Sequence, residues 1–213
     1  IHPTSVVGTI SPKAARETGL EEGTPVIIGT ADGIVNILGS GLIKCGMTMD
    51  VTGTTEIISA ITDTATSGLL CIPYIFIKDK YFLYASTRST GASLSWFKNN
   101  FYNRKAYNEK IDLYDILNKE AEEAEVGSRN LIFLHSLEGL LAPSLVYPQL
   151  KGAFIGITLE HSRKHFVRAI MESIAYYLNL VLRYWEKEGV KIEEPIRISG
   201  GGSKSEVWNQ IKA

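Results

Sequence analysis

Three turns rich in Gly, Ser and Thr constrain the fold of this chain most strongly, because each directly follows a predicted β-strand. They lie at residues 52–55 (Thr-Gly-Thr-Thr), 91–93 (Gly-Ala-Ser) and 200–203 (Gly-Gly-Gly-Ser). Such turns offer free backbone N–H groups to an anion, and glycine lets the backbone approach a ligand closely. If the three strands end at the carboxyl edge of one sheet, the turns would together form a nucleotide cleft.

Strands and helices alternate along the chain, which predicts an α/β fold with helices on both faces of a sheet. The longest helix is expected from residue 162 to about residue 187, because its apolar residues recur at spacings of three and four. Residues 25–30 are expected to form a buried strand, and residues 139–152 a loop. The other predicted strands span residues 47–51, 56–60, 74–77, 81–86, 131–135, 153–158 and 196–199, and the other predicted helices span residues 12–18, 33–42, 90–101, 107–124 and those from 204 onward.

Composition and charge favour an ordinary globular protein. The 213 residues are 45% apolar and 21% charged, which suits one large domain or two small ones. The net charge of −1 gives no basic field for nucleic acid or an anionic membrane, and no apolar run nears the roughly 20 residues that cross a bilayer. Cys45 and Cys71 are expected to be small buried residues in a reducing compartment, which indicates the cytoplasm. Because the chain starts at Ile1 and stops within a predicted helix, it is expected to be a piece of a longer protein.

Asp32 stands at a predicted strand-to-helix junction, about 20 residues before the turn at residues 52–55. Two interpretations are open. An aspartate at a helix start can be an N-cap, worth ~1 kcal/mol, or it can be a general base beside a substrate hydroxyl, worth a factor of roughly 10² to 10⁴. The Thr-Gly-Thr-Thr turn taken alone also fits an ordinary β-turn. The sequence contains neither a Walker A motif nor a dinucleotide fingerprint.

The histidines do not indicate a metal or a catalytic base. His135, His161 and His165 have no carboxylate or cysteine at metal-ligand spacing, so structural or surface positions are expected for them. No serine occurs in the G-x-S-x-G context of a nucleophile elbow.

Four blocks of the sequence resemble the FGGY family of carbohydrate kinases, and its xylulose kinase branch in particular. Residues 23–59 resemble the family's catalytic-acid and second phosphate segment, and residues 90–97 (TGASLSWF) its Gly-Ala-Ser helix start. Residues 152–176 (GAFIGITLEHSRKHFVRAIMESIAY) resemble the second family signature, and residues 197–213 (RISGGGSKSEVWNQIKA) its adenosine motif. The blocks span nearly the whole chain, and the last two are long and specific.

The resemblance implies an actin-like, ribonuclease H-like ATPase fold of two domains, with a mixed sheet and an active site between the domains. Residues 1–213 would be most of the second, nucleotide-binding domain, and the absent N-terminal domain would be its partner. ATP and Mg²⁺ would be the cofactors. By matched position, Asp32 would be the base that takes a proton from the sugar hydroxyl, with Gly33 beside it at the substrate.

Eight further residues would bind ATP by the same resemblance. They are Thr52, Gly53 and Thr54 at the β- and γ-phosphates, Gly91 and Ser95 along the phosphate path, and Gly201, Gly202 and Ser205 at the adenosine and α-phosphate. The family usually places Gln or Asn after the catalytic acid, where this chain has Gly33, and that departure leaves the sugar open.

The expected function is ATP-dependent phosphorylation of a sugar hydroxyl, with a ketopentose such as xylulose as the small-molecule substrate. A glycerol, polyol or hexulose kinase remains an alternative, as does a non-catalytic ATP-binding regulator with the same fold. Without its first domain this chain is expected to be inactive, because the opposite wall of the cleft is missing. Whether the protein forms a homodimer is open.

Overall fold

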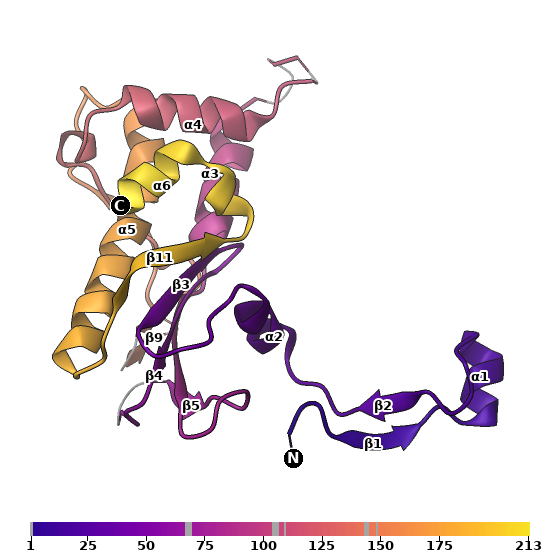
Figure 1. The fold of residues 1–213 in the computed structure, drawn as a ribbon. Helices are drawn as coiled ribbons and strands as arrows, with labels where there is room; N and C mark the ends of the chain where they lie inside the picture. The colour runs from indigo at the N-terminus through magenta and orange to yellow at the C-terminus, as the bar shows by residue number, and fades with distance from the viewer. Residues whose placement is uncertain (1, 67–69, 104–106, 109, 143–144, 148) are drawn as a thin grey trace.

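A five-stranded mixed sheet lies at the centre of the fold (Figure 1). This computed structural model describes residues 2–213 except 67–69, 104–106, 109, 143–144 and 148, and the side chains at 32–33 and 140–148 also lie outside the description. The strand order is β11-β3-β4-β6-β5. The strands are β3 (Met47–Thr52), β4 (Glu56–Thr62), β5 (Cys71–Pro73), β6 (Tyr81–Thr87) and β11 (Glu193–Ser199).

The directions of the strands bring three carboxyl ends to one edge of this sheet. Strands β3 and β4 form an antiparallel hairpin in which Thr52 faces Glu56 across the turn. Strand β6 is antiparallel to β4, and β11 is parallel to β3. Strands β3, β6 and β11 therefore run in the same direction, and the three Gly, Ser and Thr turns that follow them share an edge.

Most helices cover one face of the sheet. They are α3 (Thr90–Phe101), α4 (Leu113–Glu123), α5 (Arg163–Lys187) and α6 (Glu206–Lys212). The predicted bounds of α3 and α5 are confirmed. The apolar positions of α5 that recur at three and four residues, such as Ile170, Ile174 and Trp185, are buried against Ile58 and Leu83 of the sheet in one core cluster. Because amphipathic periodicity reports a packed face, this helix could be placed from sequence.

The opposite face carries a smaller core under one helix, α2 (Asp32–Gly39). Ile37 of that helix and the following Leu42 pack against Met49 and Phe82 of the sheet. The Tyr74 hydroxyl donates a hydrogen bond to the Leu42 carbonyl at 2.8 Å, which joins the loop after β5 to the end of α2. The predicted α/β arrangement with helices on both faces is confirmed, although the two layers differ greatly in size.

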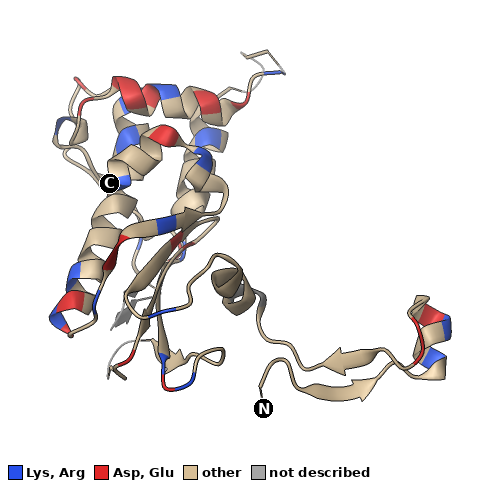
Figure 2. Ribbon diagram, in the orientation of Figure 1, with Lys and Arg blue, Asp and Glu red and all other residues tan. Residues whose placement is uncertain are grey.

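Residues 2–30 form an arm that extends away from the main sheet (Figure 1). It consists of β1 (Val6–Thr9), α1 (Pro12–Thr18) and β2 (Pro25–Ile27), and among the strands that the structure describes β1 pairs only with β2. The prediction that residues 25–30 form a buried strand is wrong, because β2 is exposed at every residue and nothing in the described chain covers it. Figure 2 shows charged residues on α1, whereas β1 and β2 carry none.

Several element bounds differ from the sequence prediction for local reasons. The first strand of the second hairpin lies at β5, earlier than the predicted residues 74–77. Helix α4 begins at Leu113 and not at 107, because the Asp112 carboxylate caps it by accepting the Tyr114 N–H at 2.9 Å. The predicted loop at 139–152 contains the hairpin β8 (Leu140–Ala142) and β9 (Leu145–Tyr147).

The remaining elements are short. Strands β7 (Ile132–Leu134) and β10 (Ala153–Ile155) pair with each other beside the main sheet, and 3₁₀ turns occur at Ser128–Asn130 and Gly201–Lys204. Cys45 and Cys71 are free thiols and are half-buried, not fully buried as predicted. None of the helices that the structure describes is long and apolar enough to cross a membrane.

Candidate active site

The three turns meet around one pocket of about 780 Å³ at the carboxyl edge of the sheet. The structure places all eight residues expected to bind ATP in its lining. These residues are Thr52, Gly53, Thr54, Gly91, Ser95, Gly201, Gly202 and Ser205. The expectation that the turns converge at one edge is therefore confirmed by the fold.

The start of α3 is joined to the turn at residues 52–55 by backbone hydrogen bonds. The Gly91 N–H donates to the Gly53 carbonyl and the Ala92 N–H to the Thr54 carbonyl, each at 3.1 Å. Within the turn, the Gly53 N–H donates to the Thr55 carbonyl at 2.9 Å. The prediction that the start of α3 leaves these N–H groups free is thus wrong. They hold the turn in place instead of offering themselves to a ligand.

Glycine is needed where these backbones touch. A Cβ atom on Gly91 would overlap the Gly53 carbonyl oxygen, and one on Gly202 would overlap the Thr52 side chain. Gly200 has a φ of +85°, and a Cβ there would overlap the Thr52 carbonyl. A Cβ atom on Gly201, by contrast, would meet no atom within 4 Å, so packing does not require glycine at that position.

Helix α4 supplies a wall of the pocket that the sequence did not indicate. Asp112, Tyr114, Asp115 and Asn118 line it, together with Lys204 and the rings of Trp96 and Trp208. The Ser205 hydroxyl donates to Asn118 Oδ1 at 2.7 Å and accepts the Trp208 N–H at 3.2 Å, so it caps α6 and ties α6 to α4. No motif marks these α4 residues, because only the packing of α4 against α6 brings them to the pocket.

Asp32 and Gly33 are the first two residues of α2. The N-cap position belongs to Ala31, so Asp32 lies within the first turn of the helix, where its negative charge is favoured by the helix dipole. The side chains of both residues lie outside the described part of the chain.

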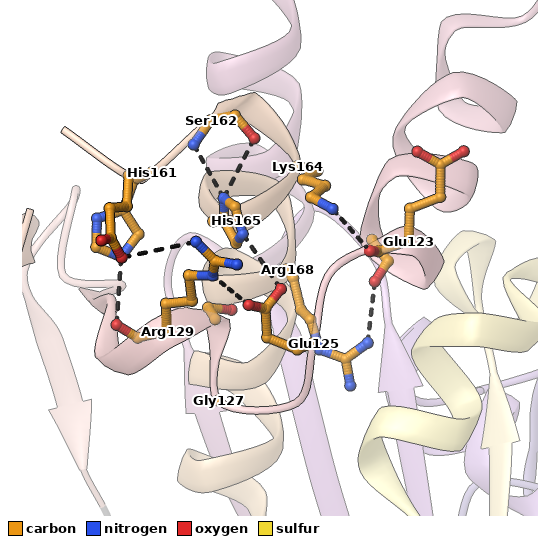
Figure 3. A network of polar contacts seen from close by, with 12 residues as sticks. Glu123, Glu125, Gly127, Arg129, His161, Ser162, Lys164, His165 and Arg168 are labelled. Carbon is orange, nitrogen blue, oxygen red and sulfur yellow. Dashed lines mark hydrogen bonds and ion pairs between the residues drawn. The ribbon is translucent and has the colours of Figure 1, made fainter. Parts of the chain in front are cut away.

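Two of the histidines hold the start of α5 in place (Figure 3). His165 Nδ1 accepts the Ser162 N–H at 2.9 Å, as part of a capping box, and its Nε2 lies 3.3 Å from Glu125 Oε2. His161 Nδ1 accepts the Thr158 N–H at 2.9 Å. Among the described residues no group of three His, Cys, Asp or Glu side chains could hold a metal ion.

His135 and Glu125 have shifted pKa values with clear causes. Burial lowers the pKa of His135 to about 4, and its ring lies 5.3 Å from that of Tyr177, so it is uncharged near neutral pH. A hydrogen bond from Arg129 lowers the pKa of Glu125 to about 2. His135 and Glu125 therefore contact neighbouring side chains of the fold. The sequence likewise predicts structural or surface positions for the histidines.

The Arg and Glu of the second family signature form a buried clamp. Arg168 Nε donates to Glu172 Oε1 at 2.7 Å, and its guanidinium also donates to the Ala121 carbonyl at 2.9 Å. Glu172 in turn accepts the Gly127 N–H at 2.9 Å and the Ser128 hydroxyl at 3.1 Å. The clamp joins α5 to the segment after α4, where residues 128–130 all have positive φ angles.

The sequence is similar to a family of known proteins. The model of the FGGY family of carbohydrate kinases, C-terminal domain, matches residues 49–213. The chain belongs to this family. Two similar curated relatives are a xylulose kinase of Bacillus subtilis, 30% identical over 210 residues, and a gluconokinase of the same species, 31% identical over 221 residues. They cover 97% and 98% of this chain, which in turn spans 40% and 41% of their lengths.

Solved structures of kinases confirm the expected actin-like, mixed α/β fold. The crystal structure of xylulose kinase from Rhodospirillum rubrum has a TM-score of 0.80 and 27% identity, and the match covers all of this chain and 42% of that one. The glycerol kinase of Plasmodium falciparum, at 21% identity and a TM-score of 0.79, shares the fold. The family and the fold that the four sequence blocks indicate are both confirmed.

The glycine contacts give a paired test. We expect Gly91→Ala to lower the free energy of unfolding by about 1–3 kcal/mol, because the new methyl group must displace the Gly53 carbonyl. Gly201→Ala is the matched control in the same pocket and should change it by less than about 0.5 kcal/mol. Chemical denaturation of both variants measures the difference, and equal effects would contradict the close packing described here.

Proposed function

We propose that the protein is an ATP-dependent kinase that phosphorylates a sugar hydroxyl, with a ketopentose such as xylulose as the first candidate substrate. The observation that carries this proposal is the convergence of eight residues, chosen from sequence for ATP, on one pocket. Membership in a family of carbohydrate kinases supports the reaction class. Because the chain spans about two fifths of its relatives, the reaction is proposed for the whole protein.

The pocket suits a nucleotide in size and in chemistry. Its volume of about 780 Å³ is within the range of roughly 300–1,000 Å³ that small-molecule sites occupy. On one side lies the turn at residues 52–55, where the exposed Thr54 can bind phosphate oxygens, whereas the buried Thr52 hydroxyl is already bonded to Lys212 and Glu56. On the other side lie the carboxylates and the Asn118 amide of α4 and the rings of Trp96 and Trp208. We propose that the β- and γ-phosphates bind at the first side and the adenosine toward Gly201, Gly202 and Ser205.

In this proposal Asp32 orients and deprotonates the sugar hydroxyl, which then attacks the γ-phosphorus in line. Its place at the start of α2, after the strand that leads out of the arm, supports a position at the boundary between two domains. Thr54, at the tip of the Thr52–Gly53–Thr54 turn, would hold the phosphates still while the bond to the transferred group changes. In the same proposal Gly33, the next residue in the sequence, lies at the sugar with Asp32.

The residues present fit a magnesium ion only if the ion is bound together with ATP, through the phosphate oxygens. The described residues offer no cluster of three metal ligands, but Mg²⁺ typically keeps several waters and needs one or two carboxylates in addition to phosphate oxygens. When bound, the ion would supply positive charge to the phosphates. We propose that the ion would lie near Asp32, without assigning that carboxylate as a ligand.

The arm supports the proposal that the active protein has a further domain. Apolar side chains on β1 and β2 are exposed, for example Val6 at 61% and Ile27 at 53%, and helix α1 buries no residue. Folded proteins rarely leave such a contiguous apolar surface uncovered. We propose that an N-terminal domain covers this surface and that residues 1–213 supply most of the second domain. We also propose that the protein works in the cytoplasm. Alone, the 213 residues would lack half of the cleft and would not catalyse transfer.

A turnover assay on the full-length protein tests the proposed reaction. ADP formation from ATP is followed with ketoses, aldoses, polyols and D-gluconate, since the relatives include a xylulose kinase and a gluconokinase at nearly equal identity. We expect strong stimulation by one of these compounds, with xylulose tested first. ATP binding without stimulation by any of them would favour the non-catalytic regulator.

The role of Asp32 is tested by Asp32→Ala in the full-length protein. We expect turnover to fall by at least a factor of about 10² to 10⁴, because the general base is removed, while ATP affinity stays nearly unchanged. The control is Asp63→Ala, which removes an exposed carboxylate at the end of β4. Steady-state kinetics and calorimetric titration provide the two readouts, and near wild-type turnover of Asp32→Ala would rule out this base.

A further inference from the structure

A buried cluster of charged side chains lies directly under the turn at residues 52–55. Lys212, at the end of α6, donates from Nζ to Asp50 Oδ2 and to Glu56 Oε1, each at 2.6 Å, and also to the Thr52 hydroxyl. Asp50 is 2% exposed and Glu56 is fully buried. Because alternate residues of a strand share a face and Thr52 pairs with Glu56, the cluster spans both strands of the hairpin at its turn.

The charges of this cluster do not balance if every group is ionised. Two carboxylates and one ammonium leave one excess negative charge in a buried site. While both groups are ionised, each also keeps one buried oxygen, Asp50 Oδ1 and Glu56 Oε2, with no hydrogen-bond donor in the described part of the chain. A buried carboxylate in this position takes up a proton in preference to remaining charged and unpaired.

The surroundings identify Glu56 as the group that holds the proton. The pKa of Glu56 is raised to about 9, first by burial and then by the Asp50 charge and a hydrogen bond with Asp50, against the opposing effect of Lys212. From α5, Tyr177 faces the same site, and burial followed by the Glu56 charge raises its pKa. From β6, the neutral Thr87 hydroxyl accepts the Glu56 N–H at 3.2 Å.

We propose that Glu56 is a positioning residue that is protonated near neutral pH, so that its cluster with Asp50 and Lys212 stays neutral under a turn that binds phosphate. The Glu56 hydroxyl donates to Asp50, and Lys212 is left to hold both carboxyl groups and Thr52 together. A negative charge at this point would repel the phosphates above it. The phosphate part of this inference rests on the function proposed above, whereas the protonation of Glu56 does not.

The pH dependence of stability follows from the raised pKa. In the unfolded chain Glu56 loses its proton near its ordinary pKa of 4.5, but in the folded chain it keeps the proton up to about 9. Folding therefore takes up one proton between these values. The stabilisation is fully present below the unfolded pKa and is lost as the pH rises through the folded pKa.

The test compares wild type with Glu56→Gln in the full-length protein, since glutamine resembles a protonated glutamate in shape and charge. We expect an infrared carbonyl band of a carboxylic acid in wild type at neutral pH that Glu56→Gln lacks. The folding equilibrium constant of wild type relative to Glu56→Gln should fall about tenfold per pH unit between roughly pH 5 and pH 9. The ADP affinity of wild type relative to the variant should fall above about pH 9.

Glu172→Gln is the matched control, because Glu172 is also a buried glutamate but is paired with Arg168. That variant should keep the infrared band and should melt at a lower temperature near neutral pH, since Arg168 loses its partner. A missing band in wild type together with a pH-independent stability ratio would overturn the protonation of Glu56. A constant ADP affinity ratio would overturn its positioning role. Absence of ADP binding by both proteins would instead overturn the proposed function, and the band and stability ratio would still decide the protonation.

Discussion

The turn at residues 52–55 is held by close contacts with two segments, the start of α3 and residues 200–202, and the rest of the pocket depends on this close approach. Gly91, Gly200 and Gly202 lie where a Cβ atom would overlap the turn or its first residue, Thr52. The first N–H groups of α3 donate to its carbonyls. These contacts join the ends of the strands, α3 and α6 at one junction. The junction therefore positions the residues proposed to bind ATP in the absence of a ligand.

Side chains beneath the turn also hold it in place. Lys212 reaches from α6 to Asp50, Thr52 and Glu56, so the end of the last helix is tied to the same turn. Glu56 is protonated because a buried carboxylate that is ionised and unpaired would cost several kcal/mol. Other family-like residues act away from the pocket: Arg168 and Glu172 clamp α5 to the segment after α4.

Local signals predicted much of the fold. The apolar spacing of α5 and the Gly-Ala-Ser start of α3 were sufficient to predict the bounds of these helices. The rule that ligands bind at the carboxyl ends of strands in an α/β sheet predicted that the three turns lie together. The sequence predictions that were wrong or missing concern features that depend on tertiary packing. Strand β2 is apolar like a core strand, but nothing described in this chain covers it. Asn118 reaches the pocket only because α4 packs on α6, and the N–H groups of α3 are already used because the turn lies against them.

The most direct test of the central claim is the binding of two nucleotides to Thr54→Val in the full-length protein. Calorimetric titration would compare a non-hydrolysable ATP analogue with AMP, which lacks the β- and γ-phosphates. If the turn binds those phosphates, the analogue should lose roughly tenfold to hundredfold in affinity, the value of a hydrogen bond to a charged group, while AMP binding stays unchanged. Equal losses for both nucleotides, or no loss for either, would contradict the account.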